Sequence, residues 1–507
     1  MKTLHASVLF AAAALLAPAF PWAATHPAPL PAPALDDEDE DDEDAEEAEE
    51  EDSDRWFAVT GGDVYTGNGA VFRGATVLSR NGVIEEIGYD LYLPEETEVL
   101  DATGYRVYPG LVALDATSRI TGGGRLMGHP IDDRHVHGNP ESFGEGQDAG
   151  GDPFAASAPD GDSEHGDGDD DPLQQASTRT ALEDSFDPFS SYLVLTLATG
   201  ITTVEQSGGA AIKLKRGEIE GVEMRSGYLS SFSYSTRNGA QKEELRQQFR
   251  DARRYLRDYR EWEEKKKQDK DLKEPSDKGI KSNVLSVLRG ENRAHFSSSD
   301  RTDLLAIAEL AQEFGFRPVI TGCTEGWTVA DELGRAGAAA ILTPRSRSAK
   351  PENLVRDGGS SIENAAILHR AGVQVAVRPQ STSIDLGGIT GRDLMHLPIE
   401  ADFAIRGGLP EQAALEAITL VPARLLGVDD RVGSLEVGKD CDLIVTDGDV
   451  LHYQTFVQYT VVHGKLVYDK QEELFFSHIR PRPEDGAGEA ESDTGEDAED
   501  GDGDSDE

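Results

Sequence analysis

Short apolar runs separated by turn residues dominate residues 55–108. Four runs rich in β-branched and aromatic residues are divided by breaks such as Gly61-Gly62 and Asn81-Gly82, and they cover 56–59, 63–65, 75–78 and 83–87. Runs of this length predict a small antiparallel sheet, and Asn-Gly is a strong signal for a two-residue hairpin. A similar rhythm returns at 441–445 and 460–468. We therefore expect both ends of the chain to contribute strands to one satellite sheet.

The middle of the chain alternates between β-rich runs and helical spacing. Apolar residues recur at helical spacing over 301–314, before a β-rich run at 318–320, and again over 362–370, before a run at 373–377. Alternating strands and helices predict a parallel sheet with crossover helices, for which a closed barrel is one solution. Residues 242–273 are dense in charge but place apolar residues on one helical face, namely Leu245, Phe249, Ala252, Leu256 and Tyr259. This pattern predicts a long amphipathic helix that covers the barrel.

Acidic residues are concentrated in three stretches. The chain has 507 residues and a formal net charge of -48, but residues 36–54, 138–172 and 484–507 hold 16, 11 and 13 acids and no Lys or Arg. Without them the balance is about -8. Such stretches are typical of disordered, solvated segments, with capture of divalent cations or basic partners as the alternative. Nucleic acid is excluded as a partner because its phosphates would be repelled.

The first 24 residues read as a secretory signal peptide. Lys2 supplies a positive start, and Ala6 to Ala17 is an apolar run too short to span a bilayer. We expect an exported protein, periplasmic or secreted, with a Pro-rich and acidic linker at 25–54; an uncleaved N-terminal anchor is the alternative. No later stretch is long and apolar enough to predict a transmembrane domain.

Only two cysteines, Cys323 and Cys441, are present, which excludes a disulfide framework. Both stand in apolar runs, where cysteine usually acts as a small buried hydrophobic residue. We expect neither to be a nucleophile.

Segments near both ends of the chain carry a family resemblance. Residues 59–67, 82–88 and 101–112 near the start, and 414–427 and 433–443 near the end, resemble the exported amidohydrolases related to imidazolonepropionase; weaker matches lie at 198–204 and 321–327. The resemblance runs from about Trp56 to Tyr468.

This resemblance implies an α/β fold, a TIM-type (β/α)8 barrel that carries a small β-sandwich formed from both ends of the chain. In chain order, the implied domains are an N-terminal β-sandwich segment at 55–108, the barrel at 109–428 with the acidic insert at 138–172, a C-terminal β-sandwich segment at 429–478, and an acidic tail at 479–507.

The resemblance also implies hydrolysis of amide or cyclic C–N bonds by water bound to one or two divalent metals, Zn, Fe or Mn. The ligands of such a metal converge at the carboxyl ends of barrel strands. The family's His-x-His pair after the first strand is replaced here by Asp115 and Thr117. A later family histidine matches Ser298, with His295 as the competitor under a shifted alignment, and the next matches Gly322. No acid stands at 378–380, where the family's catalytic Asp would fall.

A rebuilt site has few candidates. His135 and His137 form the one His-x-His in the chain, and residues i and i+2 of an extended segment share a face, so weak metal capture is conceivable; a loop role beside the acidic insert is the favoured alternative. Glu325 and Trp327 follow a predicted strand end and are candidates to line a pocket; for Glu325 the alternative is a helix-capping acid.

Three classes of function therefore remain open. The first is an exported, catalytically degenerate barrel that binds a small-molecule or peptide ligand at its mouth. The second is a working metal-dependent hydrolase that redeploys Asp115, His135, His137 or His295. A scaffold that acts through its acidic tails is a third class, and the sequence leaves homo-oligomerisation open.

Overall fold

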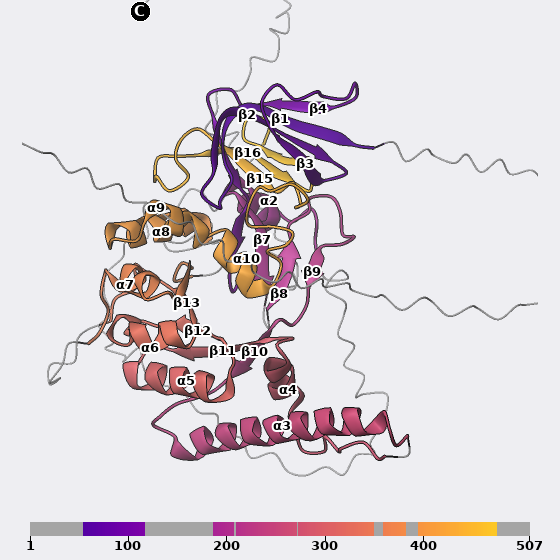
Figure 1. Cartoon of the computed structure of the whole chain (residues 1–507). Coiled ribbons are helices and arrows are strands. Elements are labelled where there is room, and N and C mark those ends of the chain that lie inside the picture. The colour runs from indigo at the N-terminus through magenta and orange to yellow at the C-terminus, as the bar shows by residue number, and fades with distance from the viewer. Residues whose placement is uncertain are drawn as a thin grey trace, which may run out of the picture. The chain divides into compact units, whose positions relative to one another are not determined.

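The computed structural model describes residues 54–116, 186–206, 209–270, 272–348, 358–381 and 394–473, all of which belong to one unit of the chain, Asp54–Glu507. They form a β-sheet and an α/β barrel (Figure 1). The predicted signal peptide, most of the acidic linker, the acidic insert and the acidic tail lie outside the described residues.

The sheet takes strands from both ends of the chain, as predicted (Figure 1). Its order is β17-β16-β15-β5-β1-β2-β3, with β4 also paired to β1. The strands are β1 (Trp56–Tyr65), β2 (Val71–Arg80), β3 (Val83–Gly88), β4 (Glu98–Asp101), β5 (Arg106–Pro109), β15 (Leu443–Thr446), β16 (Val457–Val462) and β17 (Lys465–Asp469). Antiparallel pairing of β15 with β5 joins the two ends. The sheet is mixed rather than antiparallel throughout, because β4 and β5 both run parallel to β1.

The turn at Asn81-Gly82 is the predicted hairpin between β2 and β3. Asn81 has φ 51° and Gly82 has φ 81°, the two positive values that a tight type I′ connection requires. The prediction that Gly61-Gly62 ends the first run was wrong. Strand β1 continues through both glycines, and its register with β2 shifts on each side of Gly62. Gly61 has φ 74°, so the glycines form a bulge inside one strand rather than a turn between two.

The barrel begins directly after β5 of the sheet. Its strands are β6 (Leu111–Ala113), β7 (Ile201–Gln206), β8 (Ala210–Lys213), β9 (Glu223–Arg225), β10 (Leu229–Phe232), β11 (Arg293–Ser298), β12 (Pro318–Gly322), β13 (Ala339–Leu342) and β14 (Gln374–Val377). Strands β10 to β14 form a parallel set, and β6 pairs parallel with β7. The predicted parallel order does not hold for β8 and β9, because β8 runs antiparallel to β7 and β9 antiparallel to β8. Residues 417–418 connect the two sets, because Val377 N–H donates to the Ala417 carbonyl at 3.1 Å and Val112 N–H to that of Ile418 at 2.9 Å.

Helices surround this barrel. They are α2 (Ser191–Ala198), α3 (Gly239–Lys266), α4 (Ser282–Arg289), α5 (Arg301–Phe314), α6 (Ala330–Arg335), α7 (Asn364–Arg370), α8 (Leu397–Arg406), α9 (Glu411–Glu416) and α10 (Leu420–Leu426), with short 3-10 turns at Gly326–Thr328 and Leu394–His396. Helix α5 has the predicted bounds. The Asp300 side chain caps its start by accepting from Thr302 N–H, and Gly315 ends it with φ 80°.

The predicted long amphipathic helix is α3, which contacts α4 and α5 (Figure 1). Its buried face includes Leu245, Phe249 and Ala252, and Leu256 and Tyr259 pack against the same core. Both cysteines are buried and unpaired, as predicted. Among the described helices, none combines the length and apolar character needed to cross a membrane.

Candidate functional site

A cavity of ≈ 330 Å³ opens at the carboxyl ends of the barrel strands. Its lining comes from strands β6, β7 and β10 to β14, or from residues close to a strand end: Leu114, Asp115, Glu205, Gly209, Leu229, Ser231, His295, Ser297, Thr321, Ile341 and Arg378. We call this cavity the barrel mouth. Barrels of this type place their functional groups at this end of the strands, because loops and strand ends converge there.

Asp115 and Arg378 form an ion pair across the mouth. Asp115 lies two residues after β6 and Arg378 directly follows β14, and Arg378 Nη1 donates to Asp115 Oδ2. The two side chains are unequally exposed, 61% for Asp115 and 21% for Arg378. The Arg378 backbone is held by its N–H, which donates to the Leu342 carbonyl at 2.8 Å. Asp115 has φ 57°, a left-handed conformation that Asp tolerates better than most residues.

Glu205 lies beneath this ion pair, at the end of β7. It is only 7% exposed. Its Oε2 accepts from Asp115 N–H at 2.5 Å and its Oε1 from Gly209 N–H at 3.1 Å. Burial raises the pKa of Glu205 to about 7, the Asp115 carboxylate adds to the rise, and the two backbone donors and Arg378 oppose it. A carboxyl group that changes charge near neutrality therefore faces the mouth.

His295 of β11 is held between two hydroxyl groups. Its Nδ1 lies 3.1 Å from Ser231 Oγ and its Nε2 lies 2.8 Å from Thr321 Oγ1. Burial lowers the pKa of His295, so the neutral imidazole is favoured. A neutral imidazole donates from one nitrogen and accepts at the other, so one hydroxyl accepts from the ring and keeps its own O–H free to donate elsewhere.

Of the described residues at the family's predicted ligand positions, Asp115 and the competitor His295 are the two that line the mouth. Alternate residues of a strand share a face, so His295 and Ser297 point into the mouth while Ser298 belongs to the opposite face. Of the two alternatives left open on β11, the cavity lining therefore includes His295 and does not include Ser298. Gly322 is likewise absent from the lining, where its neighbour Thr321 contributes instead. Thr117, His135 and His137 lie outside the described residues.

The pocket candidates Glu325 and Trp327 serve structural contacts away from the mouth. Glu325 accepts from Arg301 N–H at 3.1 Å and from Gly359 N–H at 2.5 Å, while Trp327 Nε1 donates to the Gly359 carbonyl at 2.9 Å. Glu325 does act as a helix-capping acid, which was the alternative. The helix that it caps is α5, through Arg301 N–H, and not the helix that follows Glu325 in the sequence.

Sequence reasoning missed Glu205 and the role of Arg378. Glu205 directly follows the run Thr202-Thr203-Val204, and an acid at the carboxyl end of a barrel strand was a readable signal. Residues 378–380 were noted as the place where the family's catalytic Asp would fall. No local sequence pattern, however, relates a cationic residue there to Asp115.

The described lining does not fit the divalent metal that the family resemblance implies. It offers one imidazole and two carboxylates, and each already has hydrogen-bond or ion-pair partners. Over the described ranges no three His, Cys, Asp or Glu side chains converge as metal ligands. A transition metal in such a barrel needs at least three converging ligands, and the Arg378 guanidinium would repel it.

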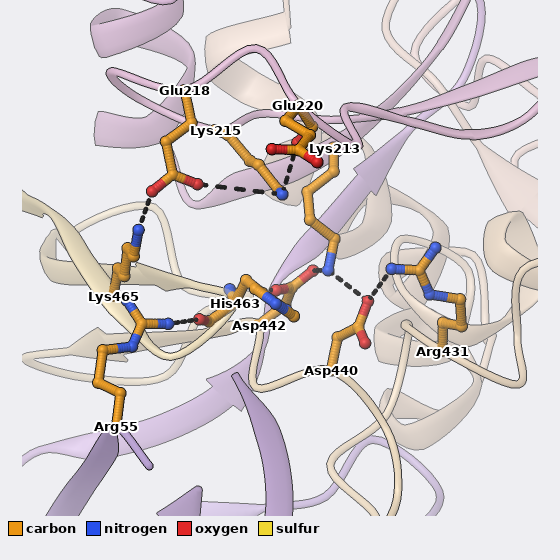
Figure 2. Close-up of polar contacts among 10 residues, drawn as sticks. All are labelled: Arg55, Lys213, Lys215, Glu218, Glu220, Arg431, Asp440, Asp442, His463 and Lys465. Carbon is orange, nitrogen blue, oxygen red and sulfur yellow. Dashed lines mark hydrogen bonds and ion pairs between the residues drawn. The ribbon is translucent and has the colours of Figure 1, made fainter. Parts of the chain in front are cut away.

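A second cluster of charges is buried between the barrel and the sheet (Figure 2). Lys213, the last residue of β8, is fully buried, and its Nζ lies 2.5 Å from Asp440 Oδ2 and 2.9 Å from Asp442 Oδ2. Arg431 binds the same Asp440 oxygen at 2.7 Å. Burial raises the pKa of Asp440, but Lys213 and then Arg431 outweigh it and hold the pKa below its usual value. Asp442 also accepts from the backbone N–H of His463 at 2.8 Å.

This cluster is structural. Asp440 and Asp442 are 7% and 3% exposed and Lys213 is fully buried, so a substrate has no access to them. A buried ammonium with two carboxylates specifies one arrangement of the segments that carry it, because losing a partner leaves a buried charge uncompensated. The cluster therefore joins the barrel strand β8 to the segment that leads into β15.

Comparisons with known proteins agree with this architecture. Residues 328–467 match the model of the amidohydrolase family. The chain is 45% identical to N-acetylglucosamine-6-phosphate deacetylase of Rattus norvegicus over 65 residues, 13% of this chain and 15% of that enzyme. It is 33% identical to amidohydrolase tasK of Hapsidospora irregularis over 85 residues, 17% of this chain and 9% of that protein. The matches thus span less than a sixth of these relatives.

A solved structure extends the likeness to most of the chain. An amidohydrolase from Thermotoga maritima MSB8 aligns with a TM-score of 0.56 and 21% identity, covering 82% of this chain and 100% of that one. This likeness concerns the fold, an α/β barrel with a separate mixed sheet, and confirms the predicted fold class. Over residues 328–467 the chain is therefore similar to the amidohydrolase family, and over most of its length it shares the fold of this solved amidohydrolase.

Proposed function

We propose that this chain is an exported, catalytically degenerate amidohydrolase whose barrel mouth binds a small-molecule or peptide ligand without hydrolysing it. The observation that supports this proposal is the ion pair between Asp115 and Arg378. Asp115 stands where the family resemblance places the first metal ligands, and Arg378 where it places the catalytic acid. A guanidinium has replaced a proton acceptor and neutralises the remaining carboxylate.

The chemical consequence concerns water activation. Water bound to a catalytic metal loses a proton near neutral pH, whereas free water does so only at about pH 15.7. Glu205, with a pKa of about 7, can accept a proton, but both of its oxygens already accept backbone N–H groups. The mouth keeps the shape and polar lining of a binding site while its described residues lack the means to generate hydroxide.

Metal content and hydrolysis decide between this function and its alternative, a metal-dependent hydrolase of C–N bonds with a rebuilt site. The full chain is purified, dialysed without chelator and analysed for Zn, Fe and Mn, and then assayed on N-acetylated amino acids and dipeptides with each metal added. We expect substoichiometric metal and no metal-dependent turnover. Stoichiometric metal that survives dialysis, with turnover lost in a chelator, would overturn the proposal.

The His295→Ala variant serves as the matched control. In a rebuilt metal site His295 is the one imidazole of the described lining, so its loss would release the metal. In a binding barrel the variant has the same metal content as the unmodified chain.

Export is tested separately. Expression of the full chain in a Gram-negative host, followed by fractionation and mass spectrometry of the mature N-terminus, should find the protein outside the cytoplasm and shortened by about the first 24 residues. Full-length protein in the cytoplasm would contradict export without bearing on the mouth.

A further inference from the structure

We infer that the barrel mouth takes a small molecule with one carboxylate group and an apolar body, and that this carboxylate replaces Asp115 as the partner of Arg378. The inference rests on the proposed binding function and adds the chemical class of the ligand. It is supported by three observations: the hydrogen bonding of the Arg378 guanidinium, the exposure of the Asp115 side chain, and the apolar and hydroxyl groups of the other walls.

Arg378 is the one cationic side chain in the described lining of the mouth. A guanidinium carries its N–H donors in a planar fork that matches a carboxylate. Among the described residues its one side-chain hydrogen bond goes to Asp115, and its buried Nε has no hydrogen-bond partner there. The donors of Arg378 are therefore underused, which favours a ligand that engages the guanidinium more fully than Asp115 does.

Asp115 is a displaceable partner. Its side chain is 61% exposed, so it returns to water when the ligand takes its place, while Arg378 stays largely covered at 21%. Ion pairs at such exposure contribute little, and competition from Asp115 weakens ligand binding by only about two- to fivefold.

The charges of the mouth favour a monoanion. Burial keeps His295 neutral, so Arg378 is left to balance the ligand, and the acids Asp115 and Glu205 lie beside it. A second negative charge on the ligand would have no cation in the described lining. A cationic ligand would be repelled by the Arg378 guanidinium.

The other walls are apolar or hydroxylic. Leu114, Leu229 and Ile341 are at most 8% exposed and form an apolar surface, and Ser297 adds a hydroxyl near the opening. The volume of ≈ 330 Å³ lies at the lower end of the range of about 300–1,000 Å³ for small-molecule sites. An apolar body of modest size therefore fits beside the carboxylate.

The test uses matched acids and amides. Binding of 3-phenylpropionate and 3-phenylpropionamide, and of 4-methylpentanoate and 4-methylpentanamide, to the full chain is measured by ligand-observed NMR titration. We expect at least one acid to bind at millimolar concentrations and its amide to bind about tenfold more weakly, since a charge-assisted bond to Arg378 is lost.

Two variants of the mouth and one control variant on α3 locate the effect. Arg378→Met should weaken acid binding about tenfold and leave amide binding unchanged, whereas Arg254→Met, on the exposed face of α3, should change neither. Asp115→Asn should strengthen acid binding at least about twofold because the competing carboxylate is gone. Asn also accepts the left-handed backbone of this position, so folding is preserved.

Equal binding of acid and amide, absence of acid binding, or acid binding unaffected by Arg378→Met would overturn the inference. Weaker acid binding by Asp115→Asn would also overturn it, because Asp115 would then hold the ligand instead of competing with it. If one of these results is obtained with protein that is metal-free and inactive, the proposed function still holds. Metal-dependent turnover would refute the proposed function, regardless of how the carboxylic acid ligands bind.

Discussion

Glu205 makes the stability of the barrel depend on pH in a direction that can be measured. Its pKa is about 7 in the folded chain, against a reference of 4.5. Below pH 4.5 the carboxyl is protonated in both the folded and unfolded states and has no effect. Between pH 4.5 and 7 the folded state holds the proton more tightly, so the folded chain loses stability as the pH rises. Above about pH 7 the loss is complete.

The size of this loss follows from the shift. Each pKa unit corresponds to about 1.4 kcal/mol, so Glu205 destabilises the folded chain by about 3 kcal/mol above pH 7 relative to pH 4. Because Glu205 is only 7% exposed, solvent screening reduces this figure little. The Glu205→Gln variant removes the titration and keeps one oxygen to accept a backbone N–H, at a constant cost of about 1 kcal/mol for the other donor.

Urea unfolding of the unmodified chain and of Glu205→Gln, at half-unit steps from pH 4 to pH 8.5, measures the effect. The difference between the two proteins cancels the titration of other groups. It should shift by about 3 kcal/mol in favour of the variant between pH 4.5 and 7 and then stay constant. A difference that is flat across this range, or that shifts in favour of the unmodified chain as the pH rises, would refute the reasoning.

Three further predictions concern other regions of the structure. Lys213→Met should lower the free energy of unfolding by about 3–5 kcal/mol, because it leaves the buried carboxylate of Asp442 without its cation and Asp440 with Arg431 alone. The exposed Lys465→Met should cost less than about 1 kcal/mol. Equal losses in urea unfolding would contradict the structural role of Lys213. Gly82→Ala should lower the melting temperature more than Gly104→Ala, although the two glycines have similar positive φ. An added Cβ at Gly82 would lie 2.5 Å from the His463 ring, whereas at Gly104 nothing lies within 4 Å. Equal melting temperatures would refute the close contact at Gly82. Cys323 and Cys441 should not react with a thiol reagent until the protein is unfolded, since burial raises both pKa values to about 12; rapid modification of the native chain would show that one of them is exposed.

Local patterns in the sequence were sufficient for much of the scaffold. Asn81-Gly82 predicts its hairpin because few residues other than Asn and Gly adopt two consecutive positive φ angles easily. Helix α5 has the predicted bounds because Asp300 and Gly315 are themselves the cap residues. The glycines at 61 and 62 show the limit of such reasoning, since a glycine pair makes a turn or a bulge depending on whether a neighbouring strand continues to pair.

The resemblance drew attention to Asp115 as a predicted ligand position, and the resembling segment 433–443 contains Asp440 and Asp442. It did not show the partner of any of these acids. Arg378 lies 263 positions from Asp115, and Lys213 lies 227 positions from Asp440. The sequence also did not show the register of β11. A shift of this strand by one residue would turn Ser298 toward the mouth in place of His295.

The sequence by itself therefore determined many of the helices and strands and the barrel class, because these depend on neighbours a few residues apart. Only the tertiary structure decided that Arg378 neutralises Asp115, that Glu205 is buried beneath them and that Lys213 unites two acids. Ion pairs and pKa shifts depend on distance and burial in space, and strand closure brings together charges that no local pattern relates.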